Sequence, residues 1–290
     1  MRIAILYICT GVYDFFWESF YLSAERYFFQ EYSWIREYFV FTDASSIYGE
    51  SENEHIHRIY QENLGWPGNT MKRFEMFLRI RDRLENQMDY LFFFNANMEF
   101  LSPVGEEMLP TEKDNGLVGA LHSWYFDQHK WNCPYERRRL SSAFIPYWKG
   151  KYYFQGSLLG GATSAFLKMC ETCNRWGDND LRNGIVPIWH DESILNKYYL
   201  LYPPKILDCR YNYCEISRNL PIERKILYKD KNKYFSFEDL KRPSYTVYPL
   251  MPGRNIIKIL NLIERIWRKI ILIIHFFNIS KIYYDSRQRM

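Results

Sequence analysis

The stretch from residue 89 to residue 100 limits most strongly how this chain can fold. Tyr90 to Phe94 is an unbroken apolar run with strong β preference and no charge. A short run of this kind is typical of a strand that is buried on both faces within an α/β sheet. It ends at Asn95 and Asn97, which are separated by a single residue. Because side chains two apart on extended backbone point the same way, we expect both amides to face one site.

That site would lie at the carboxyl end of a central strand, where ligands bind in open α/β sheets. Asparagine is also favoured in the turn that follows a strand. On these residues alone, a ligand site and a plain polar strand end are equally good interpretations, so the rest of the chain has to decide between them.

Short apolar runs alternate with helical patterns along most of the chain, which predicts an α/β fold wound around a mostly parallel sheet. The expected strands are residues 3–8, 37–42, 55–59, 90–94, 116–121, the stretch from 151 before a glycine turn at 161, and 185–190. The expected helices are residues 13–29, 71–83, a helix from 162 and a helix from 191 to 199, with a loop at 64–69 and irregular structure over 205–250.

Composition excludes some classes of protein. The 290 residues are 47% hydrophobic and 25% charged, which suits a globular chain of one large or two modest domains. The formal net charge of +4 is too small to argue for nucleic acid. Cys170 and Cys173 form a lone CxxC without the second pair that a zinc site requires, so ordinary buried thiols are expected. The amino terminus lacks the features of a signal peptide, and we expect a cytoplasmic protein.

The basic character belongs to the end of the chain. Residues 251–290 carry eight Lys or Arg against two acidic residues, and 255–277 have a helical pattern. The charge-free run 270–280 is shorter than the ~20 residues that span a bilayer. We therefore expect a catalytic domain over 1–242 and, over 243–290, a basic amphipathic tail that contacts the inner membrane surface. A core helix or a dimer contact is the alternative.

The densest group of polar residues is Trp189-His190-Asp191-Glu192-Ser193, where a strand is expected to meet a helix. Capping of the helix by Asp191 is the simpler interpretation. The functional one gives Glu192 work at a reacting carbon and Asp191 a hydrogen bond to a polar ligand. His190 is a candidate metal ligand or phosphate donor, although a lone histidine is more often structural.

Several common sites are absent from the sequence. Gly156 and the Gly160-Gly161 pair would let backbone pass close to a ligand, but they form no GxGxxG fingerprint. The chain also contains no GxxxxGK[ST] and no GxSxG. Dinucleotide oxidoreductases, phosphate-loop enzymes and serine hydrolases of the GxSxG type are therefore disfavoured.

Together these residues resemble glycosyltransferase family six, which includes the histo-blood-group A and B transferases, the α-1,3-galactosyltransferases and smaller bacterial relatives. The motifs that carry the resemblance are Tyr38-Phe-Val-Phe-Thr-Asp43, Met71-Lys-Arg73, residues 89–100, Tyr135-Glu-Arg-Arg138, residues 152–161 and Trp189-His-Asp-Glu-Ser-Ile-Leu-Asn-Lys197. They span roughly residues 1–235, so the tail lies outside the resemblance. The resemblance implies a GT-A type fold with a Rossmann-like central sheet.

The resemblance also implies roles for particular residues. Uridine would contact Ile8, Cys9, Thr10 and Tyr13. The other donor-site residues would be Arg73, Asn95, Asn97, Asp191, Lys231, Lys233 and the triplet Gln155, Gly156 and Ser157, which discriminates UDP-galactose from UDP-N-acetylgalactosamine. The acceptor would contact His122, Trp189 and Glu192. Ser157 is of intermediate size at its position. This slightly favours galactose over N-acetylgalactosamine as the donor sugar.

Asn95 and Asn97 depart from the Asp-x-Asp pair of the mammalian members and match bacterial ones. Carboxylates hold Mn²⁺ or Mg²⁺ beside the diphosphate, whereas amides are neutral and can donate hydrogen bonds. We therefore expect a site without metal or other cofactor, in which Lys231, Lys233 and Arg73 meet the charge of the leaving group.

The resemblance implies α-1,3 transfer of galactose or N-acetylgalactosamine from a UDP-sugar, with retention, onto a galactoside, either plain or fucosylated and blood-group-like. Glu192 would act as nucleophile or as stabiliser of the cationic transition state. A catalytically silent sugar-nucleotide-binding or membrane-tethered scaffold is the alternative.

The tail assignment predicts that a chain ending at residue 250 no longer binds anionic liposomes but still transfers sugar, because the tail supplies location and not chemistry. Cosedimentation with vesicles and a transfer assay on the truncated chain check this. Liposome binding that survives the deletion would contradict it.

Overall fold

The computed structural model describes residues 1–216 and 220–241. The predicted tail helix and the predicted boundary after residue 242 lie outside the described residues, so membrane contact through the tail stays a prediction. In the part of the chain that is described, no helix is both long and apolar enough to cross a membrane.

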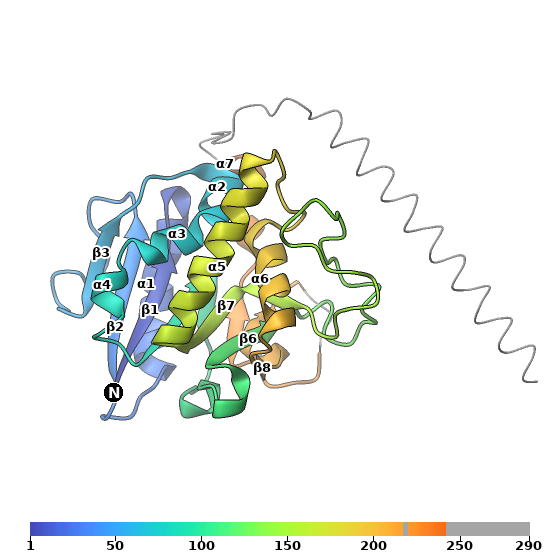
Figure 1. Ribbon diagram of the computed structural model, residues 1–290. Coiled ribbons are helices and arrows are strands. Elements are labelled where there is room, and N and C mark those ends of the chain that lie inside the picture. The colour runs from blue at the N-terminus through green and yellow to red at the C-terminus, as the bar shows by residue number, and fades with distance from the viewer. Residues whose placement is uncertain (217–219, 242–290) are drawn as a thin grey trace, which may run out of the picture. The chain divides into compact units, whose positions relative to one another are not determined.

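A seven-stranded sheet with the order β3-β2-β1-β4-β7-β6-β8 forms the centre of the described chain (Figure 1). All neighbouring strands run parallel except β7, which is antiparallel to both β4 and β6. This confirms the α/β fold with a mostly parallel sheet. The strands are β1 Arg2–Ile8, β2 Ile35–Thr42, β3 Ile56–Tyr60, β4 Tyr90–Asn95, β6 Leu117–Leu121, β7 Phe154–Ala162 and β8 Lys205–Leu207.

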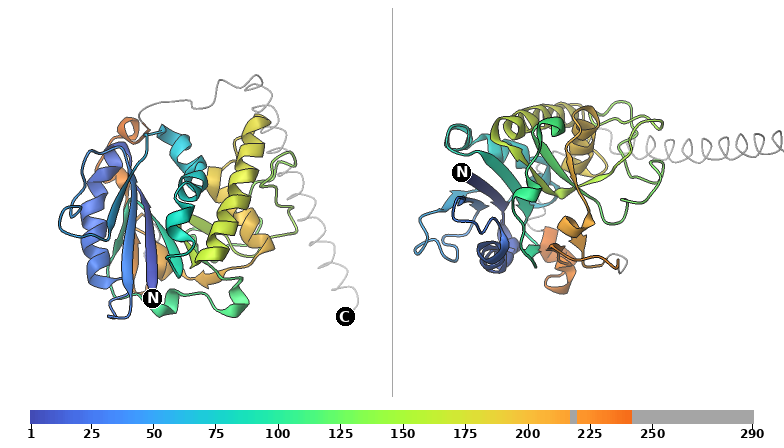
Figure 2. Two further views of the ribbon diagram at one scale, coloured as in Figure 1. Left: turned by 60° about the vertical axis from the view of Figure 1, so that its left-hand side comes forward. Right: turned by 90° about the horizontal axis from the view of Figure 1, so that it is seen from below.

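Helices cover both faces of this sheet (Figure 2). The first face packs against α1 (Trp17–Tyr27), which follows a 3-10 turn, η1 (Gly11–Phe16). The opposite face carries α3 (Arg73–Leu78), α5 (Thr163–Arg182) and α6 (His190–Leu201).

Alternate side chains of β4 serve the two faces. The ring of Phe94 lies 5.6 Å from Phe20 of α1, and the ring of Phe93 lies 5.4 Å from Phe77 of α3. The strand is therefore apolar throughout because water reaches neither side of it.

A second, three-stranded sheet with the order β5-β10-β9 adjoins the end of β4. It is built from β5 (Met98–Phe100), β10 (Ile226–Tyr228) and β9 (Tyr213–Cys214), with β10 antiparallel to β5. This pairing carries residues from the end of the described chain to the turn after Asn95. The prediction of irregular structure over 205–250 missed β9, β10 and β8 of the larger sheet, because each is only two or three residues long.

Several local predictions were wrong. The expected loop at 64–69 lies largely within a kinked helix, α2 (Gly65–Met71), and the expected helix 71–83 is broken into α3 and α4 (Arg81–Leu84). Residues 185–189 form no strand before α6. The remaining short elements are η2 Glu106–Met108, η3 Glu112–Asp114, η4 Cys209–Asn212, η5 Lys231–Lys233 and α7 Phe237–Lys241.

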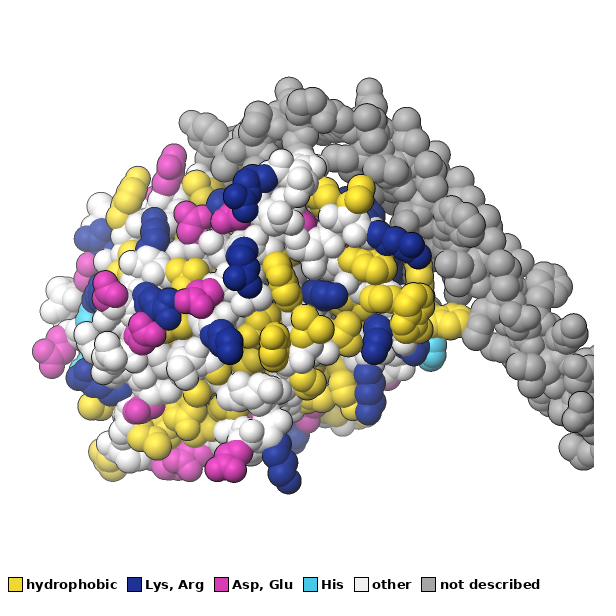
Figure 3. Space-filling view, viewed as in Figure 1, with side chains coloured by type: hydrophobic (Ala, Val, Ile, Leu, Met, Phe, Trp, Pro, Cys, Tyr) yellow, Lys and Arg dark blue, Asp and Glu magenta, His cyan; other side chains and the backbone are white. Residues whose placement is uncertain are grey.

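Two surface and core features follow from the fold. Hydrophobic side chains gather on the half of the surface that α5, α6 and the loop 122–153 form (Figure 3), and Leu140 and Trp148 of that loop are exposed. Cys170 and Cys173 are both fully buried in α5. This agrees with the expectation of ordinary buried thiols.

Candidate active site

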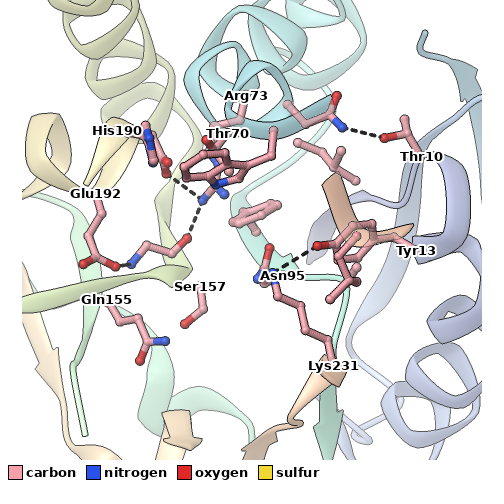
Figure 4. Close-up of a pocket in the computed structure, with 18 of the residues that line it drawn as sticks. Thr10, Tyr13, Thr70, Arg73, Asn95, Gln155, Ser157, His190, Glu192 and Lys231 are labelled. Carbon is pink, nitrogen blue, oxygen red and sulfur yellow. Dashed lines mark hydrogen bonds and ion pairs between the residues drawn. The ribbon is translucent and has the colours of Figure 1, made fainter. Parts of the chain in front are cut away.

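A cleft of about 240 Å³ opens at the carboxyl ends of β1 and β4. Because β7 is antiparallel to β4, with Phe94 opposite Leu158, its first residues lie beside the last residues of β4. The start of α6 closes another side (Figure 4). Twelve of the predicted site residues line the cleft: Ile8, Thr10, Tyr13, Arg73, Asn95, Gln155, Gly156, Ser157, Trp189, Asp191, Glu192 and Lys231. Cys9, Asn97, His122 and Lys233 are not among its lining residues.

The carboxylate of Glu192 is held at two points. Oε1 accepts a hydrogen bond from the Tyr153 hydroxyl at 2.7 Å, and Oε2 accepts one from the Gly156 main-chain N–H at 2.8 Å. Burial raises the pKa of Glu192 from 4.5 to about 7, although both of these hydrogen bonds act to lower it. The group is therefore fixed in direction and poised to change protonation near neutral pH.

An ion pair lies next to this carboxylate. Arg73 Nη1 is 3.0 Å from Oδ2 of Asp191, and both side chains are more than nine-tenths buried. Arg73 also donates to the Gly156 carbonyl, and its guanidinium lies 4.5 Å from the centre of the Phe93 ring. Burial raises the pKa of Asp191 to about 6 while Arg73 opposes the rise. Asp191 thus faces the cleft and pairs with a cation, which goes beyond a capping role.

Gly156 lies in the most crowded part of this wall. A Cβ at this position would lie 3.1 Å from Asp191 Oδ2 and 3.4 Å from the Cβ of Glu192. Its main-chain N–H is taken by Glu192 and its carbonyl by Arg73. The backbone of the predicted donor-selecting triplet is therefore tied to both charged groups.

The two asparagines that follow β4 lie together, but not as the alternation of a strand predicts. Ala96 and Asn97 form a turn, and Asn95 Nδ2 donates to Asn97 Oδ1 at 3.1 Å. Asn97 is fully buried, and its Nδ2 donates to the Lys229 carbonyl at 2.5 Å. Asn95 faces the cleft, whereas Asn97 anchors the segment that carries Lys231.

The two predicted lysines separate. Lys231 lines the cleft, and its Nζ donates to the hydroxyl of Tyr13 at 3.0 Å. Lys233 instead pairs with Glu215 at 2.5 Å, and its side chain is 55% exposed. In this arrangement Lys231, and not Lys233, supplies cationic charge to the cleft.

His122 and Cys9 do not line the cleft themselves. The ring of His122 packs against Tyr125 and Tyr153, at 4.9 and 5.8 Å between ring centres, and burial lowers its pKa to about 4. His122 thus adjoins the tyrosine that holds Glu192. Cys9 is fully buried, and its carbonyl accepts a hydrogen bond from Thr42 at 2.9 Å.

Sequence reasoning missed several lining residues. Asn69 Nδ2 donates to Thr10 Oγ1 at 2.9 Å and to Asn63 Oδ1 at 3.0 Å, which fixes the loop after β1. Trp66 lies edge-on to His190, with 4.8 Å between the ring centres, and His190 has a φ of 51°. The clustering of Asn, Gly and Trp over 63–69 is the local signal for these lining residues, although the same composition predicts a loop. The other missed lining residues are Gly65, Thr70, Phe93, Ala96, Tyr228 and Leu240.

The side chains at the end of β4 do not fit a divalent cation. Both amides are neutral, and the oxygen of Asn97 accepts from Asn95 while its nitrogen donates to Lys229. Hard cations in proteins are held mainly by carboxylates. Among residues 1–216 and 220–241, no group of three or more His, Cys, Asp or Glu side chains is arranged to hold a metal ion.

Known proteins are similar to this chain over the part that forms most of the cleft. The profile of Glycosyltransferase family 6 matches residues 1–236. The O-antigen biosynthesis glycosyltransferase WbnI of Escherichia coli is 35% identical over 243 residues, which is 83% of this chain and 100% of that protein. The human globoside alpha-1,3-N-acetylgalactosaminyltransferase 1 is 31% identical over 73% of this chain and 60% of its own length. The rat histo-blood group ABO system transferase 1 is 31% identical over 69% of this chain and 57% of its own length.

The raised pKa of Glu192 predicts how stability depends on pH. The unfolded chain releases this proton near pH 4.5, whereas the folded protein keeps it until about pH 7. The protonated Glu192 therefore adds its full contribution to the free energy of unfolding below pH 4.5, and this contribution is lost as the pH rises to about 7. We expect wild type to lose more unfolding free energy between pH 4.5 and 8 than Glu192→Gln does.

Urea denaturation of both proteins across this range measures the difference. The exposed Glu52→Gln is the matched control and should follow wild type. An equal pH dependence of wild type and Glu192→Gln would contradict the perturbed pKa.

Proposed function

The chain belongs to glycosyltransferase family 6, and we propose that it transfers galactose or N-acetylgalactosamine from a UDP-sugar, with retention, in α-1,3 linkage onto a galactoside. The fold would be of the GT-A type. The observation that carries the proposal is the carboxylate of Glu192, fixed by Tyr153 and Gly156 and facing a cleft whose other end holds Lys231.

The cleft suggests how such a donor would lie. Uridine would rest against Ile8, Thr10 and Tyr13, since these residues line the end of the cleft formed by β1 and the loop after it. The diphosphate would lie beside Lys231, which supplies one positive charge, and beside the neutral amide of Asn95. The sugar would then extend past Ser157 toward Glu192 (Figure 4).

In this pose the bond between the anomeric carbon and the diphosphate oxygen breaks, and UDP leaves with the electron pair. Glu192 either attacks the anomeric carbon to give a glycosyl-enzyme or stabilises the cation that forms. The 3-hydroxyl oxygen of the acceptor then bonds to the anomeric carbon, which breaks the bond to Glu192 where a glycosyl-enzyme has formed. The proton of the hydroxyl passes to the departing UDP or to Glu192. Retention follows from two inversions or from attack on the face that UDP leaves.

We propose that this reaction needs no metal ion. An Asp-x-Asp pair without its cation would repel the diphosphate, whereas the amide of Asn95 is neutral and does not. Arg73 neutralises Asp191 within the cleft, so the diphosphate does not meet an unpaired carboxylate there. Lys231 is then the charge that meets the leaving group.

The names of the three relatives support these classes of donor and acceptor. One is an alpha-1,3-N-acetylgalactosaminyltransferase that acts on globoside, one is a histo-blood group transferase, and one acts in O-antigen biosynthesis. We infer for this chain a donor of the UDP-galactose or UDP-N-acetylgalactosamine class and an oligosaccharide or glycan acceptor.

The proposal predicts that Glu192→Gln loses about 10²-fold or more of its transfer rate while UDP still binds, because the amide cannot act as nucleophile or anion. Transfer to a galactoside with EDTA present, and calorimetric titration with UDP, measure the two properties. Glu171→Gln, an exposed carboxylate of α5, is the control and should remain active. Near-normal transfer by Glu192→Gln would contradict the role of this residue.

A further inference from the structure

We infer that Asn212 is a positioning residue that sets the choice of donor sugar by holding the side chains of Gln155 and Ser157. This inference rests on the proposed function. Asn212 ends η4, is fully buried and does not line the cleft. It would therefore act on the sugar only through its two partners.

One amide joins both partners. Asn212 Nδ2 donates to Oε1 of Gln155 at 2.6 Å, and Asn212 Oδ1 accepts from Oγ of Ser157 at 2.9 Å. Gln155 and Ser157 are two residues apart on β7 and so project from the same face of the strand. A single side chain thus fixes the torsions of two neighbouring residues in the cleft wall.

Asn212 is itself held from behind. Its main-chain carbonyl accepts a hydrogen bond from the Ser123 hydroxyl at 2.6 Å, and the same hydroxyl accepts from the N–H of Cys214 at 3.3 Å. Ser123 is buried just beyond the end of β6, the strand beside β7. The amide of Asn212 is therefore tied to the central sheet and cannot follow its partners if they move.

These contacts decide which hydrogen-bonding groups remain for a sugar. The carbonyl oxygen of Gln155 accepts from Asn212, which fixes the amide so that its NH₂ group remains as a donor. The hydroxyl hydrogen of Ser157 is also occupied, so its oxygen remains as an acceptor. Both side chains are more than nine-tenths buried, which leaves little room for another rotamer.

Gln155 and Ser157 form the part of the cleft wall next to which UDP-galactose and UDP-N-acetylgalactosamine would differ. Ser157 lies between Glu192 and Asn95 (Figure 4), along the path of the transferred sugar in the proposed pose. UDP-galactose and UDP-N-acetylgalactosamine differ by an N-acetyl group in place of one hydroxyl. Discrimination between such ligands requires polar groups in fixed positions, because mobile ones can adapt to either. Loss of Asn212 should therefore weaken the preference of the enzyme and not only its rate.

The test compares kcat/KM for the two donors in wild type and Asn212→Ala, using the full chain. We expect the ratio of the two values to move toward 1 by about tenfold in Asn212→Ala. In a Gln155→Ala/Ser157→Ala background, the same substitution should leave the ratio unchanged, because its partners are gone. Tyr199→Phe is the control, since it removes another buried hydroxyl, which bonds to the Val118 carbonyl at 2.8 Å and not to Gln155 or Ser157.

Ser123→Ala is a milder second variant, which frees Asn212 from behind and should shift the ratio in the same direction. Equal losses with both donors would overturn the inference, since a purely structural residue acts in that way. A wild-type ratio near 1 would also overturn it. A wild type that uses neither donor would overturn the proposed function and this inference with it.

Discussion

The main chain of Gly156 makes the contacts on which the site depends. Its N–H binds the carboxylate of Glu192, and its carbonyl binds Arg73, which in turn pairs with Asp191. A buried carboxylate without such partners would be costly. Strand β7, the start of α6 and α3 therefore meet at this one residue, where an added Cβ would lie only 3.1 Å from Asp191 Oδ2.

This arrangement separates charge along the cleft. Asp191 is neutralised by Arg73, Glu192 has a pKa raised to about 7 by burial, and Lys231 lies at the other end beside Asn95. A diphosphate is favoured near the lysine, and a developing positive charge is favoured near the carboxylate. The proposed direction of the donor follows from this separation.

The sequence predicted the parts of the site that depend on local pattern. The strand at 90–94 was recognisable because both of its faces are apolar, and Trp189–Glu192 because so many polar residues adjoin a helix. What it did not predict depends on contacts between distant residues. The turn at Asn97 is held by Lys229, more than a hundred residues away, and Lys233 is turned outward by Glu215. No sequence pattern around Asn212 indicates its role, since its partners Gln155 and Ser157 lie on β7.

The central claim is metal-free, retaining transfer at this cleft, and the product itself tests it most directly. Wild type is incubated with ¹³C-labelled UDP-galactose or UDP-N-acetylgalactosamine and a galactoside in EDTA, and the linkage is determined by NMR. The account predicts an α-1,3-linked product at a rate that EDTA does not change. A β-linked product, or activity that EDTA abolishes and Mn²⁺ restores, would contradict it.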